Sequence, residues 1–84
     1  MTDLEFDVMD ELYFVVSFPE LQRLVQLSGA QLKGVLEGLL DKNYVKCFEN
    51  VSDELPHDEV DFSRNYRNYH YLASKEGLFA HNSR

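Results

Sequence analysis

Three helix-start signals follow one another near the beginning of this chain, and their spacing limits what the first half can form. In each signal a hydroxyl can accept a hydrogen bond from the third backbone N–H of a helix. The Glu or Gln three residues later can accept one from the N–H of the capping residue. The signals are Thr2-Asp3-Leu4-Glu5, Ser17-Phe18-Pro19-Glu20 and Ser28-Gly29-Ala30-Gln31. We therefore predict three helices with almost no linker, over residues 3–16, 18–27 and 29–42.

After Asn43 the apolar pattern changes from helical to extended. Residues 44–48 and 69–73 are rich in aromatic and β-branched side chains, so we predict two antiparallel strands. Asn43 itself stands where a left-handed helix cap is expected. The connection 49–68 is long for a hairpin, and we expect its acidic half to be mobile. A last short helix is predicted to begin over 74–80, with fraying at 82–84.

Length, cysteine content and apolar runs suggest where the chain works. We expect residues 1–84 to form a single domain, because 84 residues are too few for two stable cores. The only cysteine, Cys47, excludes an internal disulfide, and its apolar neighbours predict a buried thiol. The acidic N-terminus is unlike a signal peptide, and no apolar run approaches the ~20 residues that span a bilayer. We expect a cytoplasmic protein that makes no membrane contact.

The net charge of −7 is unevenly distributed along the chain. Residues 1–43 hold eight acids and three bases, residues 44–62 six acids and one base, and residues 63–84 one acid and four bases. Negative potential over most of the surface repels phosphate and opposes the counterion release that drives nucleic-acid binding. Only the C-terminal quarter is locally cationic.

Two stretches resemble winged-helix transcription regulators of the MarR-like and PadR-like kind. Residues 36–45, Leu-Glu-Gly-Leu-Leu-Asp-Lys-Asn-Tyr-Val, look like the end of the recognition helix and the entry to the wing. Residues 71–77, Tyr-Leu-Ala-Ser-Lys-Glu-Gly, are similar to the stretch that closes the wing. The resemblance implies an α+β winged helix: a three-helix bundle, a two-stranded β-wing and a short C-terminal helix. It also implies that helix 1 and the C-terminal helix are possible dimer elements.

The outward side of the predicted third helix has unusual chemistry for a DNA-reading helix. Its apolar residues leave Ala30, Gly34, Glu37, Gly38 and Asp41 facing outward, with Gln31 and Lys33 at the margins. Base edges in the major groove are read mostly by Arg, Lys, Asn or Gln, and phosphates are held by cations. We therefore predict a protein-binding surface, made of Gln31, Gly34, Glu37, Gly38 and Asp41.

The best nucleic-acid signal is the tandem triplet Arg64-Asn65-Tyr66-Arg67-Asn68-Tyr69. Arginine with interleaved tyrosine can stack on bases and hold phosphates. In the other interpretation the triplet belongs to the second wing strand, its tyrosines face the core and its arginines neutralise the acidic loop. The alternative DNA-binding set is Lys33, Arg64, Tyr66, Arg67 and Lys75, with Arg84 as a further cation.

No residue pattern points to catalysis or to a cofactor. His57, His70 and His81 share no metal-ligand spacing and are expected to be solvated or packed. We expect a small non-enzymatic module of the transcription-regulator type that needs no cofactor or metal and acts mainly through protein contacts. Its partner would be another protein or a second copy of the chain, bound through helix 1 and the C-terminal helix. DNA binding is the alternative.

Overall fold

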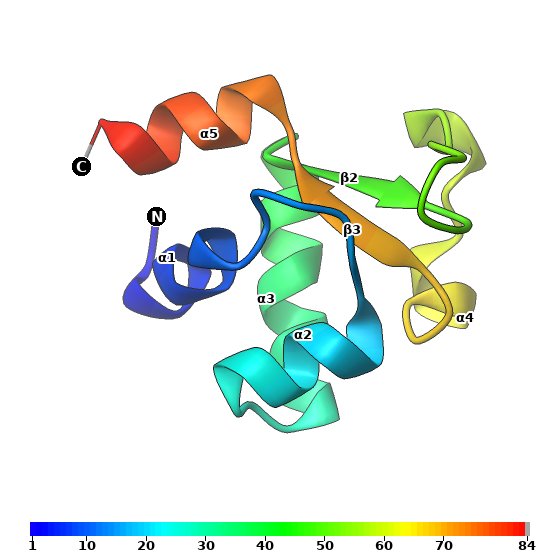
Figure 1. The fold of residues 1–84 in the computed structure, drawn as a ribbon, viewed down its shortest axis with the longest axis horizontal. Helices are drawn as coiled ribbons and strands as arrows, with labels where there is room; N and C mark the ends of the chain where they lie inside the picture. The colour runs from blue at the N-terminus through cyan, green and yellow to red at the C-terminus, as the bar shows by residue number, and fades with distance from the viewer. Residues whose placement is uncertain (84) are drawn as a thin grey trace.

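Helices begin directly after the three predicted caps. The computed structural model describes residues 1–83. In it Thr2, Ser17 and Ser28 cap helices α1 (Asp3–Asp10), α2 (Phe18–Val25) and α3 (Gly29–Asp41) (Figure 1). The Thr2 and Ser28 hydroxyls each accept from the third helical N–H at 3.1 Å, and both capping boxes are complete. Of these three predicted caps, only Ser17 lacks the return hydrogen bond of a capping box, because the carboxylate of Glu20 pairs with Arg23 instead.

The first helix is shorter than predicted. It ends at Asp10 rather than near residue 16, and Val16–Ser17 forms strand β1. The Leu12 carbonyl accepts from the Ala73 N–H at 2.9 Å, so it is unavailable for another helical turn. The adjoining Val15 and Val16 are β-branched and favour extended backbone. Tyr13 and Phe14, in the segment between α1 and β1, are exposed.

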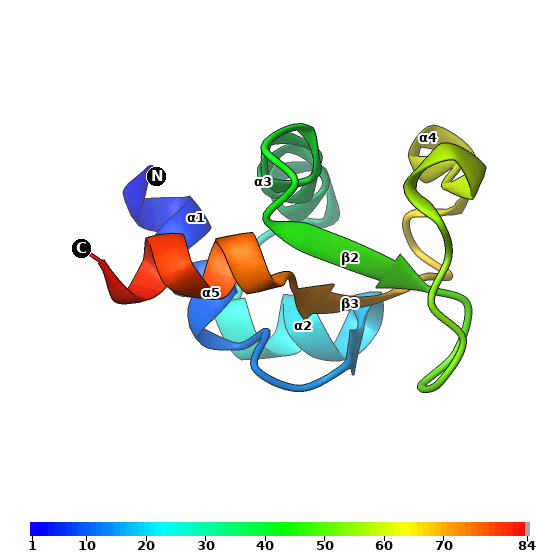
Figure 2. The same ribbon diagram turned by 90° about the horizontal axis from the view of Figure 1, so that it is seen from above.

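The sheet has three antiparallel strands, which corrects the prediction of two. Strands β2 (Val45–Phe48) and β3 (His70–Ala73) pair as predicted, and β1 adds to the other side of β3 in the order β1-β3-β2. Tyr71 on the central strand lies opposite Val16 and Cys47. Helix α5 (Lys75–Asn82) follows β3 and returns toward α1, so α1 and the end of α5 lie on the same side of the molecule (Figure 2). The described residues form a small α+β fold.

The β2–β3 connection contains short elements where a mobile loop was predicted. It holds a 3₁₀ turn, η1 (His57–Glu59), and helix α4 (Phe62–Asn65). Before them, the Asn50 side-chain oxygen accepts from the N–H groups of Ser52 and Asp53 at 2.9 and 3.0 Å, an Asx turn. The tandem triplet is therefore not a strand: its first residues lie in α4, and β3 begins only after Tyr69.

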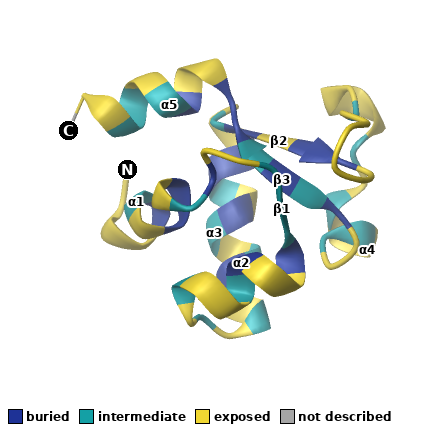
Figure 3. Ribbon diagram, viewed as in Figure 1, coloured by how far each residue is buried: buried dark blue, intermediate teal, exposed yellow. Residues whose placement is uncertain are grey.

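The core lies between the helices and the sheet. Figure 3 shows buried residues along α1, α3 and the two longer strands. Ten side chains are almost completely enclosed: Val8, Met9, Leu12, Phe18, Leu21, Leu32, Leu36, Leu39, Cys47 and Tyr71. The Tyr71 hydroxyl donates to the Tyr66 carbonyl at 2.7 Å, which satisfies the buried phenol. Asn43 has φ 62°, the left-handed cap that the sequence predicts.

Removing the α3 cap should weaken the whole fold. Ser28→Ala deletes the acceptor for the Gln31 N–H, so we expect the free energy of unfolding to fall by about 1 kcal/mol. Urea unfolding followed by circular dichroism measures the change. Ser63→Ala is the control, because Ser63 is exposed and caps no helix. An unchanged midpoint for Ser28→Ala would contradict the assigned role of this cap.

Candidate interaction surfaces on helix α3 and the β2–β3 connection

Three of the five predicted partner-binding residues lie on the open side of α3. Gly34, Glu37 and Asp41 are exposed. A Cβ atom added to Gly34 would have no heavy atom within 4 Å outside its own helix backbone and chain neighbours. This part of the helix offers a small central residue with two carboxylates on the following turns.

The other two residues are already engaged within the chain. The Gln31 side chain accepts from the Ser28 N–H at 3.0 Å, as part of the capping box. Gly38 is only half exposed, and a Cβ there would lie 3.1 Å from a carboxylate oxygen of Glu5. The close approach of α1 therefore accounts for the glycine at position 38, and no external partner is needed to explain it.

A nearly buried ion pair between α1 and α3 is the main feature that the sequence analysis missed. Lys42 Nζ lies 2.8 and 3.0 Å from the two carboxylate oxygens of Glu5, whose side chain is 7% exposed. Burial alone would raise the pKa of Glu5, but hydrogen bonds from Lys42 and from the Thr2 backbone outweigh it and lower this pKa below 4.5. The sequence identified Glu5 only as a capping residue, and Lys42 is 37 residues away.

A hollow separates α3 from the β2–β3 connection. Its volume is about 170 Å³, and its walls are Glu37, Leu40, Asp41, His57, Val60 and Phe62. Leucine, valine and phenylalanine supply apolar surface, while the two carboxylates come from the exposed stripe of α3. This combination suits an apolar side chain that carries positive charge beside it.

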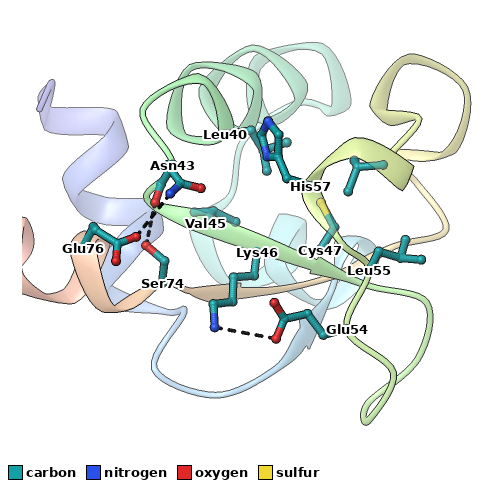
Figure 4. A pocket seen from close by; sticks show the side chains of 11 residues that line it. Leu40, Asn43, Val45, Lys46, Cys47, Glu54, Leu55, His57, Ser74 and Glu76 are labelled. Atoms are coloured by element: carbon teal, nitrogen blue, oxygen red, sulfur yellow. Dashed lines mark hydrogen bonds and ion pairs between the residues drawn. The ribbon is translucent and has the colours of Figure 1, made fainter.

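A second, smaller cavity of about 110 Å³ runs beside β2 (Figure 4). Leu40, Val45, Cys47 and Leu55 give it apolar walls, and His57 borders both this cavity and the hollow. Burial raises the pKa of the Cys47 thiol to about 12, so it stays protonated at neutral pH. Cys47 is therefore the buried thiol that the sequence predicts.

Two polar contacts are formed between residues that line this cavity. Lys46 Nζ lies 3.6 Å from Glu54 at one end, and the Asn43 amide donates to Glu76 at 3.3 Å at the other (Figure 4).

Within residues 1–83 no group of three His, Cys, Asp or Glu side chains is placed to hold a metal ion. His81 stacks on Phe6 with ring centroids 4.3 Å apart, and His57 is exposed.

The structure brings together three residues of the alternative nucleic-acid set. Two cations lie over the Tyr66 ring: Lys33 Nζ is 5.1 Å and Arg67 Cζ 5.5 Å from its centroid. The Arg67 guanidinium also reaches the start of α3, where a Cβ on Gly29 would lie 3.3 Å from it. We call Lys33, Tyr66 and Arg67 the cation–tyrosine cluster.

The remaining members of that set lie apart from the cluster or are paired. Arg64 lies 3.8 Å from Asp61. Lys75 begins α5, which meets the other end of α3 through the Asn43–Glu76 hydrogen bond. A helix of 13 residues is about 20 Å long, so Lys75 is far from the cluster. Arg84 lies outside the described residues.

No protein-family model, curated protein or solved structure matches this chain. In the part of the chain that the structure describes, none of the helices has the length and apolar character needed to cross a membrane.

Proposed function

We propose that this chain is a cytoplasmic, non-enzymatic winged-helix module of the transcription-regulator type that acts mainly through protein contacts. The order of elements supports the winged-helix assignment: three capped helices, the β2–β3 pair, and a short helix after β3. The third strand, β1, is a two-residue addition to the predicted pair. In this assignment α3 is the helix that would read DNA, so the proposal is argued from the chemistry of its surface.

One observation carries the protein-contact function. The exposed Glu37 and Asp41 border a hollow whose remaining walls are largely apolar. A phosphate backbone would be repelled by these carboxylates, whereas a protein segment with an apolar residue next to Lys or Arg would satisfy both kinds of surface. The proposed partner is therefore a basic, partly apolar protein segment.

Reversing the charges of Glu37 and Asp41 should weaken recognition of such a segment. A peptide-display library is selected on the folded chain, and we expect the recovered sequences to place an apolar residue beside Lys or Arg. For the best peptide, Glu37→Lys with Asp41→Lys should raise Kd about tenfold or more, measured by fluorescence anisotropy. The matched control is Asp7→Lys with Glu49→Lys, which changes the net charge equally at exposed sites elsewhere.

Duplex DNA binding is the second candidate function, and the cation–tyrosine cluster favours it. The same anisotropy assay with random duplex DNA distinguishes DNA binding from protein binding. Non-specific binders have Kd values of about 10⁻⁴ to 10⁻⁶ M at physiological salt, and we expect this chain to bind more weakly than that range. A micromolar complex that is lost in Lys33→Ala with Arg67→Ala would overturn the protein-contact proposal in favour of DNA.

A further inference from the structure

The outer edge of β2 carries backbone groups that do not pair with β3. In an antiparallel pair of strands, successive residues direct their N–H and carbonyl groups alternately toward the neighbouring strand and away from it. Ala73, which lies opposite Val45, donates its N–H to Leu12 at 2.9 Å rather than to β2. Val45 and Ala73 are therefore a non-hydrogen-bonded pair, and the N–H and carbonyl of Val45 point away from β3. The Cys47 carbonyl follows the same alternation, because it accepts from the Leu55 N–H at 2.9 Å on the outer side.

The chain covers only part of this outer edge. As it turns back along β2, Glu54 forms a bridge with Phe48. Pro56 ends the pairing, because proline has no N–H and the 3₁₀ turn η1 begins at the next residue. Within residues 1–83 no protein group is hydrogen-bonded to the N–H or the carbonyl of Val45, or to the N–H of Cys47.

These three backbone groups are buried beside a cavity. Val45 is 2% exposed and Cys47 1%. Both residues line the cavity of about 110 Å³ in Figure 4, which we call the β2 cavity. Almost all buried backbone N–H and carbonyl groups in proteins have a partner, because an unpaired group loses its hydration without compensation. The β2 cavity is therefore suited to a polar molecule that pairs with this edge.

The Val45 backbone determines the chemistry of that molecule. It offers a donor and an acceptor side by side, so its complement carries an acceptor next to a donor. A primary carboxamide has this arrangement, because its carbonyl and its NH₂ group share one carbon. A carboxylate has no donor, and the exposed Glu54 and Glu76 on the cavity wall oppose a second negative charge.

The other walls and the volume limit the size of the molecule. Leu40, Leu55 and Val60 supply apolar surface to the β2 cavity. An apolar cavity of about 150 Å³ holds one benzene molecule, so a cavity of about 110 Å³ holds about five non-hydrogen atoms. A chain of one or two carbons can then pack against these walls while the carboxamide pairs with Val45. Water supplies the hydrogen bonds but leaves the apolar walls hydrated.

We propose that the β2 cavity binds a short aliphatic carboxamide through the edge of β2. The ligand carbonyl accepts from the Val45 N–H, and the ligand NH₂ donates to the Val45 carbonyl. A free small amide and the side chain of asparagine or glutamine in another protein both carry this chemistry. The site does not use Glu37 or Asp41, so this proposal and the protein-contact function can fail independently of each other.

Propionamide and butanone test the site as a matched pair of probes, because they differ only by NH₂ against CH₃. In an NMR titration of the folded chain the Val45 amide signal should shift saturably with propionamide, with a Kd of about 1 mM for a ligand of this size. Butanone leaves the Val45 carbonyl unpaired, so its Kd should be at least about tenfold higher. Hydrogen exchange at Val45 should slow when propionamide binds, and exchange at Lys46, whose N–H faces β3, should not change.

A Val45 signal that does not move in about 100 mM propionamide would overturn the proposal, as would equal Kd values for propionamide and butanone. A second pair of probes separates the two sources of the carboxamide. N-acetyl-asparagine methylamide is compared with the leucine compound, which has a side chain of the same shape without polar atoms. Tight binding of the asparagine compound assigns the site to a side chain of another protein, and binding of propionamide alone assigns it to a free amide. Equal binding of the leucine compound would contradict the carboxamide assignment.

Discussion

Gly77→Ala should prevent α5 from docking, whereas Gly34→Ala should stabilise the same domain. A Cβ on Gly77 would lie 2.1 Å from the Tyr44 carbonyl oxygen and 2.8 Å from Met9 Cε. The Tyr44 backbone cannot easily move away, because its N–H donates to Leu39 and its carbonyl accepts from Ser74, at 2.9 and 2.8 Å. Overpacking against such a fixed group should cost at least about 3 kcal/mol of unfolding free energy.

The glycine at position 34 provides the control within the same chain. Gly34 lies in mid-helix in open space, so an added methyl group meets nothing and improves helix propensity by about 1 kcal/mol. Urea unfolding followed by circular dichroism should give midpoints that move in opposite directions for the two variants. A Gly77→Ala midpoint equal to that of the wild type would contradict the tight packing of α5 on Tyr44.

The parts of the fold that the sequence predicts correctly depend on neighbouring residues. A cap acts within three residues, so the helix starts after Thr2, Ser17 and Ser28 can be predicted from the local sequence alone. Strand β1 is different, because a two-residue strand exists only through its pairing with β3, more than 50 residues away. No local pattern distinguishes Val16 in such a strand from Val16 at the end of a helix.

The candidate surfaces likewise contain features that local sequence predicts and features that depend on tertiary packing. Helical periodicity correctly predicts that Gly34, Glu37 and Asp41 are exposed. It does not predict that α1 covers Gly38, since that contact depends on the packing of two helices. The cation–tyrosine cluster also depends on tertiary structure, because the path of the β2–β3 connection decides where Tyr66 and Arg67 meet α3. In the sequence Tyr66 and Arg67 belong to the tandem triplet, and Lys33 lies more than 30 residues before them.

Removing the cation from the Glu5–Lys42 pair should destabilise the domain strongly at neutral pH. Lys42→Met leaves a nearly buried carboxylate that keeps the hydrogen bond from the Thr2 N–H but loses its positively charged donor. Breaking a fully buried pair costs about 3–5 kcal/mol. Because the Lys42 side chain is 43% exposed, and solvent screens part of the interaction, we expect a smaller loss of about 2 kcal/mol in urea unfolding.

The pH dependence follows from the sign of the Glu5 shift. Lys42 and the Thr2 backbone lower the pKa of Glu5. In the wild type this carboxylate therefore stabilises the fold at neutral pH. That stabilisation is lost as the pH falls through the lowered pKa. In Lys42→Met, burial disfavours the charged form, and protonation relieves the cost. The difference between variant and wild type should therefore be largest near pH 7 and shrink below about pH 4.5.

A second lysine ion pair separates burial from charge pairing. Lys46 has the same side-chain exposure as Lys42, 43%, but its partner Glu54 is 48% exposed where Glu5 is 7%. Lys46→Met should therefore change the unfolding free energy by less than about 0.5 kcal/mol, with little dependence on pH. Equal losses of unfolding free energy for Lys42→Met and Lys46→Met would contradict this prediction. They would mean that burial of the partner carboxylate contributes nothing. The whole effect would then come from removing a positive charge from this acidic chain.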